Sequence, residues 1–115
     1  MIAVIFEVEP YGEHKQKYLE IAGKLKAELT KIDGFISVER FQSLTDDNKI
    51  LSLSFFRDKQ AVAEWRNLNS HRTAQNVGRE TLFENYRLRI ADVVRDYGKN
   101  DREQAPLDSR RENSM

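Results

Sequence analysis

The side chains best suited to chemistry gather in one stretch, where the single tryptophan, Trp65, and one of the two histidines, His71, stand six residues apart. An indole provides a broad apolar wall, and an imidazole exchanges a proton near neutral pH. Arg72 and Gln75 follow closely, and small-molecule sites combine apolar walls with a few polar groups of this kind. The stretch therefore predicts a small-molecule pocket, with Trp65 and His71 as reactive residues and Arg72 and Gln75 as substrate-binding residues.

Each candidate also has a purely structural interpretation. A lone tryptophan in a helix more often packs in the core than acts on a ligand. His71 could lie on the surface, as is expected for His14. Tyr86 and Phe55 could line the pocket from two strands, with core packing as the alternative, which is favoured for Phe55. Two separated histidines without paired carboxylates do not predict a metal site.

The spacing of apolar residues predicts the elements that must position these side chains. Alternation predicts strands over residues 2–9, 35–43, 49–57 and 84–97, and a three- to four-residue spacing predicts helices over residues 13–32 and 58–68. Asp33-Gly34 predicts the left-handed end of the first helix, and Asp58 predicts the N-cap of the second. Asn69-Ser70 is expected to interrupt the second helix, and a short further helical turn then carries His71. The β-α-β-β-α-β order predicts an α+β, ferredoxin-like fold with an antiparallel sheet.

The sheet in such a fold has one face covered by helices and one face that needs another cover. In the third strand, the more apolar set is expected to face the helices, namely Leu51, Leu53 and Phe55. The second face is then expected to carry Ile5, Ile50 and Phe56, which is too apolar for water. This pattern predicts a homodimer that packs two such faces together.

Composition narrows the class of protein. The 115 residues carry a net charge of 0, with both signs interspersed, so no basic field exists to attract nucleic acid. The absence of cysteine excludes disulfides and thiolate metal sites. The apolar run at the start is too short for a signal sequence or a membrane span. A soluble cytoplasmic protein without nucleic-acid or membrane partners is expected.

One folded domain is predicted over residues 1–97. Residues 98–115 are polar and charged, and such a segment buries too little apolar surface to offset its ordering entropy. We therefore expect a mobile C-terminal tail, or alternatively a tail that packs across a partner subunit.

Three segments carry a resemblance to a known family: the helix DKQAVAEWRNLNSH, the following HRTAQNVGR and the final YRLRIADVVRDY. Together with the element order, they resemble the antibiotic biosynthesis monooxygenases, which are dimeric α/β-barrel proteins, over residues 1–97. Some members oxidise polyphenols or quinols with O2 and no cofactor. The resemblance implies the same reaction on a small aromatic phenol or quinol, in which Trp65 walls the cavity and stacks on the ring. His71, which stands where that branch has a tyrosine, would receive the proton.

Other members degrade haem, and the resemblance to that branch is weaker. The haem-degrading proteins have an asparagine in the first strand, where this chain has Ile5, Phe6 and Glu7. They also have a haem-ligating histidine where this chain has Gln75, and glutamine is a poor haem ligand. The quinone-forming branch has an asparagine where this chain has Ala61, so identical chemistry is not implied. Haem degradation and non-catalytic binding of a small aromatic ligand are the alternatives.

Overall fold

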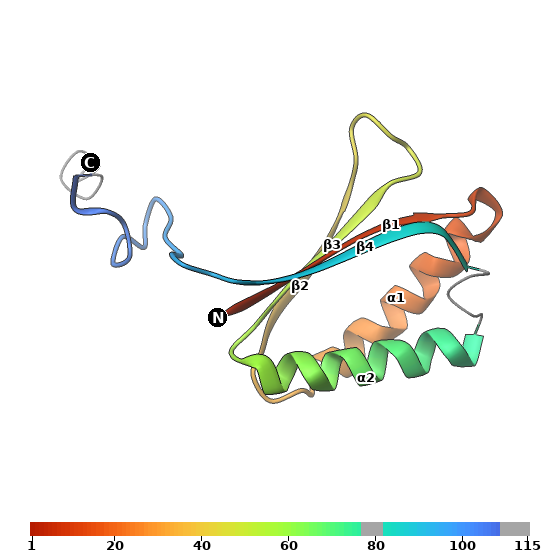
Figure 1. The fold of residues 1–115 in the computed structure, drawn as a ribbon, viewed down its shortest axis with the longest axis horizontal. Helices are drawn as coiled ribbons and strands as arrows, with labels where there is room; N and C mark the ends of the chain where they lie inside the picture. Colours follow the sequence, from red (N-terminus) through yellow and green to blue (C-terminus); the bar gives the residue numbers. More distant parts are fainter. Residues whose placement is uncertain (77–81, 109–115) are drawn as a thin grey trace.

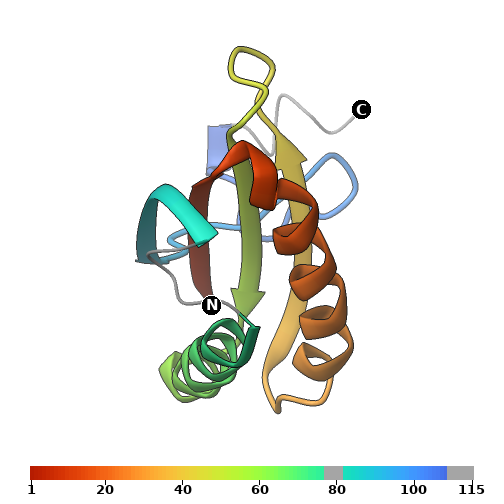
Figure 2. The same ribbon diagram turned by 90° about the vertical axis from the view of Figure 1, so that its right-hand side faces the viewer.

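A computed structural model describes the backbone of residues 1–76 and 82–108 and the side chains of residues 1–69 and 82–108. These residues form β1 (Ile2–Pro10), η1 (Gly12–His14), α1 (Lys15–Leu29), β2 (Phe35–Gln42), β3 (Ile50–Phe56), α2 (Lys59–Asn76) and β4 (Phe83–Asp92). The strands pair antiparallel in the order β2-β3-β1-β4, and both helices cover the same face of the sheet (Figures 1 and 2). The predicted α+β, ferredoxin-like fold is confirmed.

Both helices form for reasons visible in the sequence. In α1, apolar side chains at three- and four-residue spacing are buried: Tyr18, Ile21, Ala22, Leu25 and Leu29. Asp58 begins α2, because its Oδ1 accepts a hydrogen bond from the backbone N–H of Ala61 at 2.9 Å. The expected break at Asn69-Ser70 is wrong, since α2 runs without interruption to Asn76. Neither residue is a strong helix breaker, and only their modest helix propensity suggested a break.

The core lies between the helices and the sheet in two adjoining clusters. The first cluster surrounds Trp65, whose neighbours come from β1, β3 and both helices: Ile2, Val4, Leu25, Leu29, Phe56, Ala61 and Val62. The second cluster joins the other end of α1 to the sheet and includes Phe6, Val8, Tyr18, Ile50 and Phe83. Edge-to-face contacts fix the rings there, with Tyr18 and Phe83 centroids 5.6 Å apart.

The predicted facing of β3 is wrong. Ile50, Ser52, Ser54 and Phe56 are buried toward the helices, while Leu51, Leu53 and Phe55 lie on the outer face and are half-buried. The register explains this, because Phe56 pairs with Ile2, and cross-strand partners share a face of the sheet. Two of the four inner residues of β3 are small serines, and Ser52 lines a hollow between the helices and the sheet.

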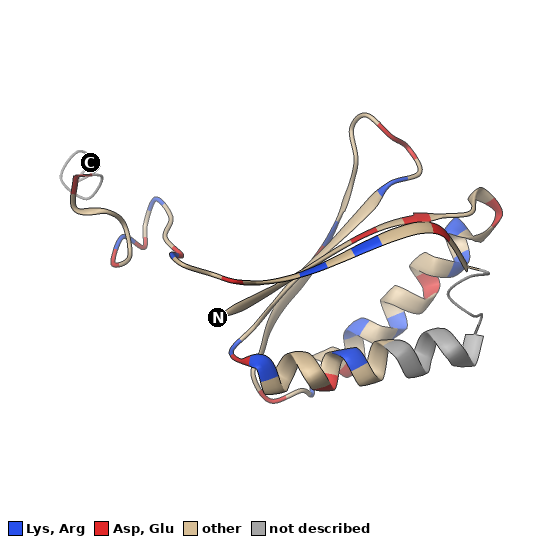
Figure 3. Ribbon diagram, in the orientation of Figure 1, with Lys and Arg blue, Asp and Glu red and all other residues tan. Residues whose placement is uncertain are grey.

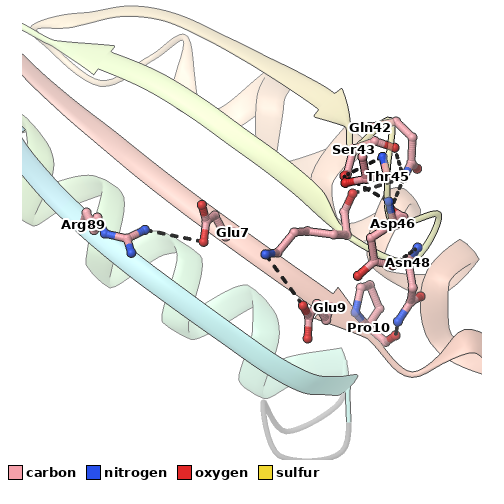
Figure 4. A network of polar contacts seen from close by, with 10 residues as sticks. Glu7, Glu9, Pro10, Gln42, Ser43, Thr45, Asp46, Asn48 and Arg89 are labelled. Atoms are coloured by element: carbon pink, nitrogen blue, oxygen red, sulfur yellow. Dashed lines mark hydrogen bonds and ion pairs between the residues drawn. The ribbon is translucent and has the colours of Figure 1, made fainter.

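The outer face of the sheet is therefore a different surface from the predicted one. Ile5 lies on it as expected, but its neighbours across the strands are Leu53 and Arg89. We call outer sheet face the set Ala3, Ile5, Phe41, Leu51, Leu53 and Phe55. Ion pairs flank it, with Arg89 Nη1 3.4 Å from Glu7 Oε2 and Lys49 Nζ 3.9 Å from Glu9 Oε1 (Figure 4).

The turn between β2 and β3 is held by side-chain hydrogen bonds to the backbone. Gln42 Nε2 donates to the carbonyl oxygens of Asp46, Asp47 and Lys49 at 3.0–3.1 Å. Asn48 Nδ2 donates to the carbonyl oxygen of Pro10 at 2.6 Å, which ties the turn to the end of β1 (Figure 4). The hairpin predicted from its Asp and Asn residues is confirmed.

Beyond β4 the chain leads away from the sheet (Figure 1). Its described part folds locally, since Gln104 Oε1 accepts from the N–H of Asp96 at 2.8 Å and the Arg102 guanidinium lies 5.3 Å from the Tyr97 ring centroid. Ala105 is buried. The predicted boundary near Gly98 and the mobility of the tail stay predictions.

Candidate functional site

Trp65 lies at the centre of the candidate site. It belongs to the buried stripe of α2 with Ala61 and Val62, and only 5% of its surface is exposed. The core-packing interpretation therefore describes part of its role. The indole also lines two hollows, so packing and ligand contact are compatible for this residue.

The first hollow, which we call the inner cavity, lies between α1 and the sheet. Its volume is about 430 Å³, counting the space that is open to solvent. Most of its wall is apolar, with Phe6, Leu25 and Trp65 among its lining residues. Four polar side chains interrupt that wall: Tyr18, Arg40, Ser52 and Asn69. A few polar groups in an apolar cavity are typical of small-molecule sites.

Arg40 supplies the charge of the inner cavity, and the neutral Tyr18 hydroxyl lies beside it. Burial raises the pKa of the Tyr18 phenol, and the charge and hydrogen bonding of the neighbouring Arg40 guanidinium oppose that rise. The Arg40 Nε atom is buried and has no hydrogen-bond partner among the described residues. Ser52 is the cross-strand partner of Arg40, so both side chains leave the sheet on the same face.

The second hollow, which we call the outer groove, runs between α2 and β4 and has a volume of about 660 Å³, again counting open space. Its floor is formed by three side chains of β4 that are 38–51% exposed: Tyr86, Leu88 and Ile90. The inner cavity and the outer groove share Phe6, Trp65 and Asn69 as lining residues. A single ligand could therefore contact both hollows at Trp65.

The predicted site residues are only partly brought together. Trp65 and Tyr86 line the same groove, as a shared pocket requires. Phe55 lies on the outer sheet face opposite Ala3 and does not line either hollow, because the register of β3 turns it away from the helices. The predicted role of Phe55 in substrate binding is therefore corrected.

The side chains of His71, Arg72 and Gln75 lie outside the described residues. The backbone at these positions continues α2, which removes the chain break that was expected to bring His71 back toward Trp65. Asn69, one helical turn after Trp65, is the polar residue of α2 that lines both hollows.

Four contributors to the site were missed by the sequence analysis: Tyr18, Arg40, Ser52 and Asn69. A signal for two of them was present in the hairpin. The alternation in β2 places Arg40 in phase with Val38, which packs against the core, and the register then puts Ser52 opposite Arg40. A charged residue on the inward side of a strand, opposite a small hydroxyl residue, indicates a polar site in the core.

Charges of both signs are interspersed over the helices and strands, as Figure 3 shows. Among the described residues, no three or more His, Cys, Asp or Glu side chains are grouped so that they could hold a metal ion. No helix in the described part of the chain has the length and apolar character needed to cross a membrane.

Comparison with known proteins places this geometry in a family. The chain is 43% identical over 101 residues to the jasmonate monooxygenase ABM of Pyricularia oryzae, covering 88% of this chain and 47% of that protein, so it spans about half the length of that relative. Its fold is similar to Rv0793 of Mycobacterium tuberculosis, with a TM-score of 0.73 at 15% identity, covering 84% of this chain and 98% of the other. It is also similar to SnoaB, a cofactor-independent oxygenase of Streptomyces nogalater, with a TM-score of 0.66 at 12% identity, covering 83% and 94%. Residues 1–77 match the antibiotic biosynthesis monooxygenase family, and the chain therefore belongs to this family.

Proposed function

We propose that this chain is a cofactor-independent monooxygenase that oxidises a small aromatic phenol or quinol with O2 at the outer groove. The observation that carries the proposal is the position of Trp65, whose buried indole lines both hollows. Membership of a monooxygenase family supports the reaction type. Two similar proteins support it further, because one is named a jasmonate monooxygenase and the other a cofactor-independent oxygenase.

In the proposed reaction, the deprotonated phenol supplies the electrons that reduce O2. One oxygen atom forms a new C–O bond on the ring, and the other leaves as water together with one hydrogen from the hydroxyl and one from the ring C–H. A phenol plus O2 thus gives a quinone plus water, without an external reductant. The chain must hold the ring, accept the hydroxyl proton for a time and exclude solvent.

The described residues match the first of these tasks. Trp65 and Tyr86 present aromatic surfaces on the groove, and Phe6 lies 6.0 Å from Tyr86 between ring centroids, so a flat ring can be held between apolar walls. Leu88 and Ile90 extend the apolar surface of the groove. We assign the acceptance of the hydroxyl proton of the substrate to His71, as the sequence suggests.

We further propose that the working unit is a homodimer that packs two copies of the outer sheet face together. Half-buried Leu51, Leu53 and Phe55 with the exposed Phe41 form an apolar surface there, which a single copy leaves in contact with water. The ion pair of Arg89 with Glu7 lies beside it.

With menadiol, a small hydroquinone, insertion of one oxygen atom gives hydroxymenadione and water, whereas two-electron oxidation without insertion gives menadione and H2O2. Oxygen uptake together with identification of the product therefore tests the proposed oxidation. The wild-type protein should increase the rate above the protein-free autoxidation, and heat-denatured protein should not. Trp65→Phe should keep the fold and lower kcat/KM by about five- to tenfold, because an aromatic contact is worth about 1 kcal/mol. His71→Ala should lower kcat more than it changes KM if the imidazole receives the proton.

The same assay separates the alternatives. If menadiol binds and quenches the single tryptophan but oxygen uptake stays at the protein-free rate, the chain is a non-catalytic binding protein for such ligands. If neither binding nor uptake occurs across monocyclic and bicyclic hydroquinones, the proposed substrate class is wrong.

A further inference from the structure

We propose that Arg40, assisted by the Tyr18 hydroxyl, binds the carboxylate of an organic-acid substrate, whose apolar body lies in the outer groove beside Trp65. This inference rests on the proposed function, because it assigns a further property to the substrate of the same site. It concerns the inner cavity, which the proposed oxidation does not use.

The first observation is the state of the Arg40 side chain. Its Nε atom is buried without a hydrogen-bond partner among the described residues, although buried donors are almost always paired in folded proteins. A guanidinium presents its N–H groups as a planar fork that matches the two oxygens of a carboxylate. A bound carboxylate would supply the missing acceptor.

The second observation is that no described lining residue of the inner cavity supplies a carboxylate to pair with the Arg40 guanidinium. None of the described residues that line the inner cavity is an aspartate or a glutamate, and most of them are apolar, including Val38, Leu25 and Phe6. A positive charge among apolar groups is costly unless an anion accompanies it. The cavity is therefore suited to an anionic group and unsuited to a second cation.

The third observation is the protonation state of Tyr18. Burial raises the pKa of its phenol above the ordinary value of 10.0 against the opposing effect of Arg40, so Tyr18 keeps its proton at neutral pH and can donate it in a hydrogen bond. Ser52, opposite Arg40, and Asn69 add further polar groups to the same lining. Four polar side chains thus line the same cavity.

The two hollows differ in size and in lining, so each suits a different part of the ligand. The inner cavity is the smaller hollow and has Arg40 and three other polar side chains in its lining, which fits a carboxylate better than a ring. The outer groove is larger and has Tyr86, Leu88 and Ile90 as its floor, which fits an apolar body. Phe6, Trp65 and Asn69 line both hollows, so the two hollows adjoin, and the proposed acid lies across the wall that they share.

Calorimetric titration with a matched pair of probes tests this assignment. The probes are 1-naphthoate and 1-naphthalenemethanol, which have the same ring system but differ in charge. The wild-type protein should bind the carboxylate about tenfold more tightly or better, since a hydrogen-bonded charge is worth about 1.5–3 kcal/mol and 1.4 kcal/mol is tenfold. Arg40→Gln should abolish this preference and leave the binding of the neutral alcohol within about twofold.

Three further variants make the result specific. Arg40→Lys keeps the charge but loses the fork, so it should retain only part of the preference, and Tyr18→Phe should reduce the preference by a smaller factor than Arg40→Gln. Arg66→Gln removes a positive charge from the outer groove and should keep the preference. Circular dichroism and thermal melts establish that each variant is folded before it is titrated.

The outcomes that overturn the assignment are distinct from those that overturn the oxidation. The assignment is wrong if folded Arg40→Gln keeps the full preference, if Arg66→Gln alone removes it, or if wild type binds both probes equally or neither probe. The titration needs no turnover. A carboxylate preference that depends on Arg40 without menadiol oxidation would reject only the proposed reaction, and menadiol oxidation without that preference would reject only the carboxylate site.

Discussion

Asp58 determines where α2 begins, and through the helix it determines where Trp65 lies. Its Oδ1 accepts from the N–H of Ala61 at 2.9 Å, and its Oδ2 accepts from Arg57 Nε at 2.9 Å. Arg57 also donates to both carboxylate oxygens of Asp33, at 3.2 and 3.0 Å. One arginine therefore joins the start of α2 to the turn after α1, and both elements form walls of the site.

These contacts make the stability of the chain depend on pH at its acid end. The backbone hydrogen bond from Ala61, followed by the interaction with Arg57, lowers the pKa of Asp58 below its ordinary value of 3.8. A carboxyl group whose folded pKa is lowered stabilises the fold at pH values above its unfolded pKa. That stabilisation is lost as the pH falls through the folded pKa.

Replacement of Asp58 by asparagine and by alanine should distinguish the contribution of the N-cap hydrogen bond to stability from that of the carboxylate charge. Asp58→Asn keeps a cap acceptor, so it should lose only the charge-dependent part and approach wild-type stability as the pH falls from 7 to 3. Asp58→Ala loses the cap as well and should stay less stable than Asp58→Asn throughout. Urea unfolding at pH 7 and pH 3 measures the free energy of unfolding of each protein. A difference between wild type and Asp58→Asn that is equal at both pH values would contradict the assigned pKa shift.

At the scale of elements, the connection between α1 and β2 depends on one glycine. Gly34 has a φ of +93°, which side chains with a Cβ atom rarely adopt. Its carbonyl oxygen accepts from the N–H of Arg57 at 2.7 Å. A Cβ atom added there would lie 3.1 Å from the Cβ of Ala61. The positive φ predicted at Asp33-Gly34 is confirmed, although α1 itself ends earlier, at Leu29.

Two glycine-to-alanine substitutions should therefore have opposite signs. Gly34→Ala should destabilise the fold by about 1–2 kcal/mol from the backbone conformation alone, with a further cost from the contact with Ala61. Gly23→Ala, in the exposed middle of α1 with nothing within 4 Å of the added methyl group, should stabilise it by about 0.5–1 kcal/mol. Chemical denaturation gives both values, and a stabilising Gly34→Ala would show that the turn relaxes to a different conformation.

Periodicity predicted the elements well but not every face or end. The alternation of β1 and the stripe of α1 gave the correct inner residues, because in both elements only one face is strongly apolar. In β3 both faces carry large apolar residues, so composition favoured Leu51, Leu53 and Phe55, whereas pairing with β1 buries the other set. The break expected at Asn69-Ser70 does not occur, because the modest helix propensity of these two residues does not by itself end a helix.

The candidate site shows the same limit. Trp65 was predicted because its residue type is rare and its helix stripe is clear. Arg40 was not predicted, because its role depends on which side of β2 faces α1 and on a partner strand that sets the register. The role of a polar residue in a core becomes visible only when its neighbours from distant parts of the sequence are known.

At the scale of the whole molecule, the helices cover one face of the sheet and leave the outer sheet face without a cover in a single chain (Figure 2). A dimer through this face would bury the apolar residues of β3 at its centre and place ion pairs such as Arg89 with Glu7 at its margin. An apolar centre with a charged margin is the usual arrangement of a stable interface. The site hollows lie on the opposite side of the sheet, so dimerisation leaves them open.

Substitutions on the two faces of β3 should therefore have different consequences. Leu53→Asp places a charge in the middle of the outer sheet face and should convert a dimer of about twice 13.5 kDa into a folded monomer. The dissociation constant of the dimer should rise by about 30-fold or more, which corresponds to about 2 kcal/mol. Phe56→Asp places the same charge in the core, where the native side chain is fully buried, and should prevent folding. Sedimentation measures the first effect, and circular dichroism measures the second.

Deletion of residues 98–115 in the wild-type background tests whether the tail packs across the partner, because a tail confined to its own subunit would leave the dimer unchanged. A wild-type chain that sediments as a monomer at micromolar concentration would reject the dimer, and it would leave the apolar surface around Leu53 to be explained by another partner.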